Sequence, residues 1–151
     1  MRCRTNYRSG FTLIEVMIVV VIVAILAAVA IPSYVESVSR AARADARAAM
    51  MTMMQQQERF FSQNNTYQAV SNSSANATFK NWSGDGTHAA AKWILSAAAC
   101  AGDGITDCIA ITAVPHISVW TDATVSSMNF TSRGQATCTP SGLSVSTCWP
   151  R

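Results

Sequence analysis

Ser9-Gly10-Phe11-Thr12-Leu13-Ile14-Glu15 is the stretch that decides the fold, because it opens a run of apolar residues that extends to Ile31. As a helix, residues 11–31 would span about 31 Å at about 1.5 Å per residue, which is close to the hydrocarbon thickness of a bilayer. The run therefore predicts a membrane-spanning helix near the start of the chain.

Glu15 is the one acidic residue inside this run. A carboxylate in a membrane helix costs about 2.5–3.5 kcal/mol on insertion scales, which makes it a candidate functional residue. If the chain were cut after Gly10, the new α-amino group of Phe11 would lie one helical turn from Glu15, within reach of an ion pair. The alternative is an acid that only reaches back to the membrane interface.

Three arginines, Arg2, Arg4 and Arg8, precede Gly10 and are expected to hold the N-terminus in the cytoplasm. They also carry the excess charge: the whole chain has a formal net charge of +3, and removing them leaves eight basic residues against eight acidic ones. A neutral mature chain gives no composition-level argument for nucleic-acid binding, so we expect nucleic acid to be an unlikely partner.

An ordinary secretory signal is the competing interpretation of the N-terminus. Its apolar region of roughly 7–15 residues would end at a small-residue cleavage site such as Ala28-Val29-Ala30. The chain would then be a secreted protein, for example an enzyme, that starts near Ile31. The length of the run and the presence of Glu15 argue against this alternative.

Pro32 follows the apolar run and is expected to kink the helix, since it lacks a backbone donor and disfavours helix at Ile31. The helical pattern resumes from Tyr34 to about Gln63, in a segment rich in good helix formers and without Gly or Pro. Apolar residues recur at helical spacings along it: Val35, Val38, Ala42, Ala46, Ala49, Met53 and Phe60. We expect core packing, in preference to metal or partner binding, for the methionines Met50, Met51, Met53 and Met54. For Arg40, Arg43 and Arg47 with Asp45 we expect a solvated helix face.

Residues 68–91 read as a long surface connection, rich in Asn, Ser, Thr, Gly and Ala. In residues 92–98 and 108–114 the sequence changes to a period of two residues, the repeat of a β-strand. This pattern predicts two strands joined by a turn at Gly102-Asp103-Gly104. A third strand is expected over residues 125–132, and a short fourth over 143–147. A helix followed by an antiparallel sheet of three to four strands is an α+β fold, with the helix covering one sheet face.

Five cysteines are present, and Cys3 would leave with the leader. The remaining four, Cys100, Cys108, Cys138 and Cys148, allow three pairings. Cys100 and Cys108 flank the expected turn, where a disulfide is geometrically easy, so we favour Cys100–Cys108 with Cys138–Cys148. Stapling of this kind is typical of small domains in oxidising compartments.

The N-terminal motif resembles that of the type IV pilins and pseudopilins: a short basic leader, Gly10, Phe11-Thr12-Leu13-Ile14-Glu15, and an apolar run that closes on Ile31-Pro32-Ser33-Tyr34. The ending Cys148-Trp149 resembles that of PilE-type minor pilins. The resemblance implies a pilin fold with a cleaved leader (1–10), a transmembrane and filament-core helix (11–32) and a globular head (33–151).

The resemblance also implies how such a subunit works. A prepilin peptidase would cut between Gly10 and Phe11 and methylate the new amine of Phe11, and Glu15 would neutralise the amine of a neighbouring subunit in the filament. Implied partners are other pilin subunits, the inner-membrane assembly platform and membrane lipid before assembly. The subunit would pass from the inner membrane, as a single-pass protein, to a surface pilus for assembly, adhesion or twitching motility.

Two related functions share the same N-terminal motif: a type II secretion pseudopilin and a DNA-uptake pilin. Catalysis has no evident carrier, because His88 and His116 lack a flanking nucleophile or acid motif. No cofactor or metal is expected, since Asp103 and Asp107 fall short of a calcium ligand set and no C-x-x-C pair is present. We expect Trp93, Trp120 and Trp149 to be core or covering aromatics.

Overall fold

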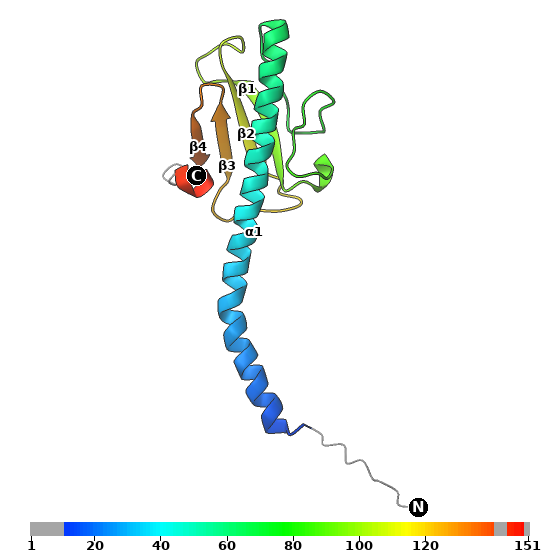
Figure 1. The fold of residues 1–151 in the computed structure, drawn as a ribbon, viewed down its shortest axis with the longest axis vertical. Coiled ribbons are helices and arrows are strands. Elements are labelled where there is room, and N and C mark those ends of the chain that lie inside the picture. The colour runs from blue at the N-terminus through cyan, green and yellow to red at the C-terminus, as the bar shows by residue number, and fades with distance from the viewer. Residues whose placement is uncertain (1–10, 141–144, 150–151) are drawn as a thin grey trace, which may run out of the picture. The chain divides into compact units, whose positions relative to one another are not determined.

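The computed structural model describes residues 11–140 and 145–149 of the chain. These residues form two compact units that divide after Val38. The long helix α1 (Leu13–Asn64) contributes to both units and continues through Pro32 (Figure 1). It ends where Asn65 adopts a left-handed backbone (φ 54°), a conformation that Asn tolerates and that commonly terminates helices.

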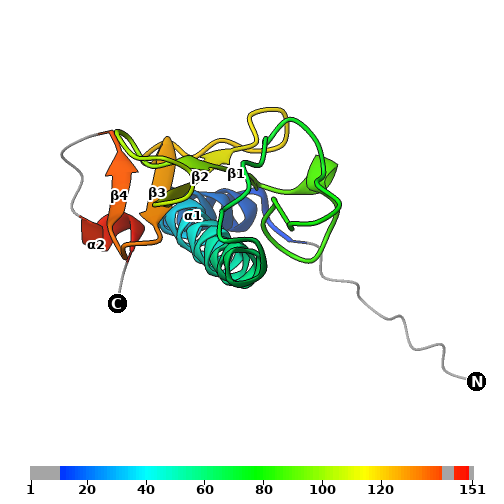
Figure 2. The same ribbon diagram turned by 90° about the horizontal axis from the view of Figure 1, so that it is seen from above.

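In the unit that begins at Ser39, α1 lies across one face of the sheet (Figure 2). The residues of α1 that face the sheet are buried at helical spacing, as the sequence predicts for Ala42, Ala46, Ala49 and Met53. They are Ala42, Arg43, Ala46, Ala49, Met50, Met53, Met54 and Gln57. Small alanines at three of these positions allow the helix to approach the sheet closely. The expected burial of Val35 and Met51 is wrong, since both side chains are exposed.

Four antiparallel strands form the sheet in the order β1-β2-β3-β4. Their bounds are Trp93–Ala99, Ile109–Pro115, Ser127–Thr131 and Ala136–Thr139. In β1 and β2 alternate residues are buried, which places Trp93, Leu95 and Ile111 in the core under α1. The predicted α+β fold, a long helix packed on an antiparallel sheet, is confirmed.

The connection between α1 and β1 is held by two buried amide side chains. Gln57 pairs with the backbone of Gln68, donating to its carbonyl (2.7 Å) and accepting from its N–H (3.0 Å). Asn81 donates to the carbonyls of Ser71 and Ser74 (both 2.8 Å) and accepts from the N–H of Asn76 (3.1 Å). Both side chains are fully buried, so this long connection is an ordered part of the head.

The same connection joins the sheet through isolated bridges, Val70 to Ala97 and Trp82 to Ile94, and contains a short 3₁₀ turn, η1 (His88–Ala90). Figure 2 shows it at the β1 edge of the sheet, while the short helix α2 (Val145–Cys148) lies at the β4 edge.

The expected fourth strand over residues 143–147 is wrong. The fourth strand is β4, which begins at Ala136 after a turn with Gly134 at φ 78°, and residues 145–148 are helical. Residues 143 and 144 lie outside the described part. Pro140 follows β4 directly and cannot donate to a ladder, and the disulfide from Cys138 to Cys148 holds α2 beside β4.

Candidate functional site

The first turn of α1 is capped by Thr12, a residue that our sequence analysis did not single out. Its hydroxyl oxygen accepts a hydrogen bond from the backbone N–H of Glu15 (3.3 Å), and its carbonyl accepts from the N–H of Val16 (3.3 Å). Thr12 and Glu15 have the spacing of a capping box, which is the sequence signal that could have identified the cap. Glu15 also places a negative charge at the positive end of the helix dipole.

The apolar part of α1 is exposed along its whole described length. Phe11 is 83% exposed, and the large apolar side chains from Leu13 to Ile31 are each more than half exposed. The helix is long and apolar enough to cross a membrane. An exposed apolar surface of this size requires a covering phase, either lipid or other protein.

The sequence-predicted site residues of this segment fall in two groups. Phe11 and Glu15 are described and exposed, whereas Gly10 and the rest of the leader, including Cys3, lie outside the described residues. Pro32 lies inside α1, and the Ser33 hydroxyl donates to the carbonyl of Ala30 (3.0 Å) beside it. The kink at Pro32 stays a prediction.

The disulfide pairing is Cys100–Cys108 and Cys138–Cys148, as predicted. The first closes the turn between β1 and β2, and the second joins β4 to α2. The two pairs have Cα–Cα distances of 5.4 and 6.5 Å, within the ordinary range. In the turn between β1 and β2, Asp103 forms an ion pair with Arg133 (2.9 Å).

Arg43 was expected on a solvated helix face, and this expectation is wrong. Its guanidinium donates two hydrogen bonds to Asp122, from Nε to Oδ2 (2.6 Å) and from Nη2 to Oδ1 (2.7 Å). Both side chains are buried, so the pair fixes the loop between β2 and β3 on α1. Helical periodicity places Arg43 on the core face but gives no signal for its acidic partner in a distant loop.

The carboxylate of Asp122 also accepts from the N–H groups of Thr124 (2.9 Å) and Val125 (3.0 Å). Desolvation by burial raises the pKa of Asp122, but the hydrogen bonds from Arg43 and from these two backbone groups, together with the charge of Arg43, lower it below the ordinary value. Asp122 is therefore ionised at neutral pH.

Tyr67 connects the end of α1 to the head. Its hydroxyl donates to Oε1 of Glu58 (2.9 Å), and its ring stacks on Phe61 with centroids 4.6 Å apart. Burial, followed by the hydrogen bond to Glu58, raises the pKa of Tyr67 above its ordinary value.

The two histidines of the described residues do not form a catalytic arrangement with an acid or a nucleophile. Their rings lie 5.9 Å apart, and each hydrogen-bonds a backbone carbonyl: His88 that of Asn72 and His116 that of Ala91. Trp93 is fully buried, and Trp120 and Trp149 pack partly buried against the core, as predicted.

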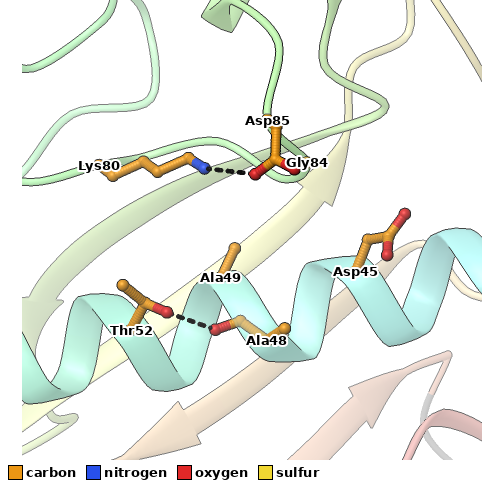
Figure 3. Close-up of a pocket in the computed structure, with 7 residues that line it drawn as sticks. All are labelled: Asp45, Ala48, Ala49, Thr52, Lys80, Gly84 and Asp85. Atoms are coloured by element: carbon orange, nitrogen blue, oxygen red, sulfur yellow. Dashed lines mark hydrogen bonds and ion pairs between the residues drawn. The ribbon is translucent and has the colours of Figure 1, made fainter.

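A pocket of about 240 Å³ lies between α1 and the connection before β1 (Figure 3). Small side chains of α1, such as Ala48 and Thr52, form its floor, and Asp45 and Asp85 carry its carboxylates. Lys80 points toward Asp85 at 3.9 Å, a loose ion pair in which the Asp85 side chain is fully exposed. The pocket is small and holds no set of groups that would support catalysis.

The helix α1 is apolar and exposed in its N-terminal part, is capped by Thr12 beside Glu15, and packs on an antiparallel sheet in its C-terminal part. These features define a pilin-like filament subunit. Two models of known protein families match the chain. Residues 5–31 match the prokaryotic N-terminal methylation motif, and residues 32–138 match the family described as type IV minor pilin ComP, DNA uptake sequence receptor. The second match covers most of the chain, which therefore belongs to this family of type IV minor pilins.

No significant match was found among curated proteins or among solved structures. Membership of the family places this chain in a class of structural subunits, which assemble with other pilins and the pilus machinery. The methylation motif and the apolar helix fit a membrane-anchored pilin that is assembled into a surface pilus. The family description makes the expectation against nucleic acid doubtful, because a neutral net charge does not fix where the charges lie.

Proposed function

We propose that the chain is cleaved between Gly10 and Phe11, methylated on Phe11 and held in the inner membrane by residues 11–32 with its N-terminus cytoplasmic. Residues 33–151 then form the head outside the membrane. The observation that carries this proposal is the apolar part of α1, whose large side chains are each more than half exposed and which lies within the methylation motif. Prepilin peptidase, the assembly platform and lipid are the partners that this route requires.

Polymerisation then replaces lipid with the helices of neighbouring subunits. Glu15 is exposed in the first turn and so is accessible to the methylated amine of another subunit. An unpaired carboxylate in an apolar filament core would be costly, whereas a paired one is tolerated. The pairing therefore selects one register between neighbouring helices.

Replacing Glu15 by Ala tests this mechanism. Because Glu15 is exposed and outside the head, we expect normal folding and normal leader cleavage, together with a strong reduction of the subunit in sheared filaments. Immunoblots of membranes and of sheared pili measure both quantities. A matched control is Val16→Ala, next to it in the same exposed turn; wild-type incorporation of Glu15→Ala would refute the pairing.

DNA reception is a second candidate function, favoured by the family description as a DNA uptake sequence receptor. We infer that the head, presented on the pilus surface, binds DNA. The test is the affinity of the detergent-solubilised mature protein for a fluorescent duplex at several salt concentrations. Phosphate contacts predict an affinity that falls steeply with salt, by a slope of about −0.9 per contact in a double-logarithmic plot.

A further inference from the structure

Two lysines and four aromatic rings lie along the β1 edge of the head. We name this set the cation–aromatic strip: Lys80, Trp82, His88, His116, Lys92 and Trp120. Lys80 Nζ lies 5.8 Å from the centre of the Trp82 ring, and Lys92 Nζ lies 5.9 Å from that of Trp120.

The two ends of the strip are joined by the histidines. The Trp82 and His88 rings lie 6.3 Å apart, and the His88 and His116 rings 5.9 Å apart. Two backbone hydrogen bonds complete the link. The N–H of His116 donates to the carbonyl of Lys92 (2.8 Å), and the carbonyl of His116 accepts from the N–H of Trp120 (2.9 Å). The six residues therefore form one continuous surface.

The strip stands on rigid supports. Trp82 bridges to β1 at Ile94, and its indole N–H donates to the carbonyl of Gly86 (2.8 Å). Trp120 packs on the buried ring of Trp93, with centroids 5.7 Å apart. Such a surface loses little conformational entropy when it binds a partner.

Each histidine keeps one ring nitrogen available. The nitrogen bound to a backbone carbonyl must donate: Nε2 in His88 (3.1 Å) and Nδ1 in His116 (3.2 Å). The other nitrogen makes no hydrogen bond within the described residues, so it can contact a ligand. Neither ring is fully buried.

The strip carries two lysines beside aromatic rings, whereas two arginines elsewhere in the head are held by buried or partly exposed acids. Arg43 is occupied by Asp122, and Arg133, beyond β3, is paired with Asp103. Two acids lie near the strip in the described structure: Asp45 lines pockets with Lys80 and Lys92, and Asp85 forms an ion pair with Lys80 that is long and exposed and therefore weak. An anionic polymer can displace it at little cost.

We propose that the cation–aromatic strip is the DNA contact surface of this pilin, with Lys80 and Lys92 on backbone phosphates and the Trp82 and histidine rings against sugars or accessible bases. The proposal rests on the DNA reception proposed above. Phosphate contacts supply salt-dependent affinity, and ring contacts supply affinity that depends little on salt. The strip contains both kinds of group.

The experiment uses the full-length mature protein in detergent and a fluorescent mixed-sequence duplex. The double variant Lys80→Gln/Lys92→Gln should lose affinity by about tenfold or more at about 0.1 M salt and reduce the salt slope by about 2. Arg133→Gln removes one positive charge at the opposite end of the strands and should leave the affinity within about twofold.

Two further variants separate charge from stacking. Asp85→Asn removes the acid that competes for Lys80, so it should strengthen binding by about twofold or more. Trp82→Ala should weaken binding by about fivefold or more while the salt slope stays unchanged. Because Asp85 is fully exposed, Asp85→Asn keeps the test valid even where a lysine or tryptophan variant folds poorly.

The outcomes separate the two proposals. If the wild type binds no DNA at low salt, both DNA reception and the strip are refuted. If the wild type binds, but the lysine double variant keeps its affinity and slope and Asp85→Asn has no effect, DNA reception stands and the strip is wrong. A weaker double variant together with a tighter Asp85→Asn variant supports the strip.

Discussion

Asp122 is the residue on which the loop between β2 and β3 depends, because its carboxylate accepts from the Arg43 guanidinium and from two backbone N–H groups. Removal of one partner from a buried pair leaves an uncompensated charge, which is far more costly than the loss of a surface ion pair.

Asp122→Ala should therefore lower the free energy of unfolding by about 3 kcal/mol, because it removes the carboxylate that pairs with the buried Arg43 guanidinium. Urea denaturation followed by circular dichroism measures this change. Asp103→Ala, which breaks the more exposed pair with Arg133, is the matched control and should cost less than about 1 kcal/mol. Equal losses in the two variants would contradict the assignment.

The same pair predicts a pH dependence of stability. The folded-state pKa of Asp122 is lowered, so its contribution is complete above the unfolded-state value of about 3.9 and is lost as the pH falls through the folded-state pKa. The difference in unfolding free energy between wild type and Asp122→Asn should thus be constant above about pH 5 and shrink toward lower pH. A difference that grows on acidification would have the wrong sign.

At this scale the sequence was informative where the signal is local. The spacing of Ala42, Ala46, Ala49 and Met53 identified the buried face of α1, and the capping signal at Thr12 was present although unused. Arg43 was misplaced because the partner that makes its burial tolerable lies in a distant loop. Periodicity carries no information about such pairs.

Among the elements, the connection before β1 departs most from the sequence expectation. It was expected as a long surface connection, but Asn81 is fully buried and its side chain hydrogen-bonds three backbone groups. Asn is common in exposed loops, so composition cannot distinguish the buried Asn81 from the other asparagines of the connection. The strands β1 and β2 were predicted within a residue of their bounds because alternation is a local signal.

Asn81→Ala should lower the free energy of unfolding by about 2–3 kcal/mol, since it leaves buried backbone groups without partners. It should also weaken DNA binding, because Asn81 lies in the sequence between Lys80 and Trp82, two residues of the cation–aromatic strip, and its hydrogen bonds hold this part of the connection in place. Thermal denaturation and the duplex-binding assay measure the two effects. The control is Asn72→Ala, in the same connection, which removes a side chain that makes no hydrogen bond within the described residues. It should change neither the stability nor the affinity for DNA. If the two variants behave alike, Asn81 does not organise the connection.

For the molecule as a whole, net charge was a poor guide to partners. The neutral mature composition led to an expectation against nucleic acid, while the family description names a DNA receptor. The described cations differ in their surroundings: Arg43 and Arg133 form close ion pairs with acids, whereas Lys80 and Lys92 lie beside aromatic rings. Only the fold brings residues 80–92 and 116–120 onto one surface.

Membership of the minor pilins rests on the match of residues 32–138, and the methylation motif at residues 5–31 agrees with it. The disulfide pairing was predictable because one pair brackets a turn and leaves a single choice for the other. The place of the subunit in the filament depends on contacts with other chains, which no single sequence encodes in a local pattern.

The most direct test of the account is the N-terminal residue and the intact mass of the protein recovered from sheared surface filaments. We predict a chain that starts at methylated Phe11 and has lost the hydrogens of two disulfides. A chain that starts near Ile31 in the soluble fraction would contradict the account, because residues 11–31 would then be a discarded signal and not the anchor of a pilin.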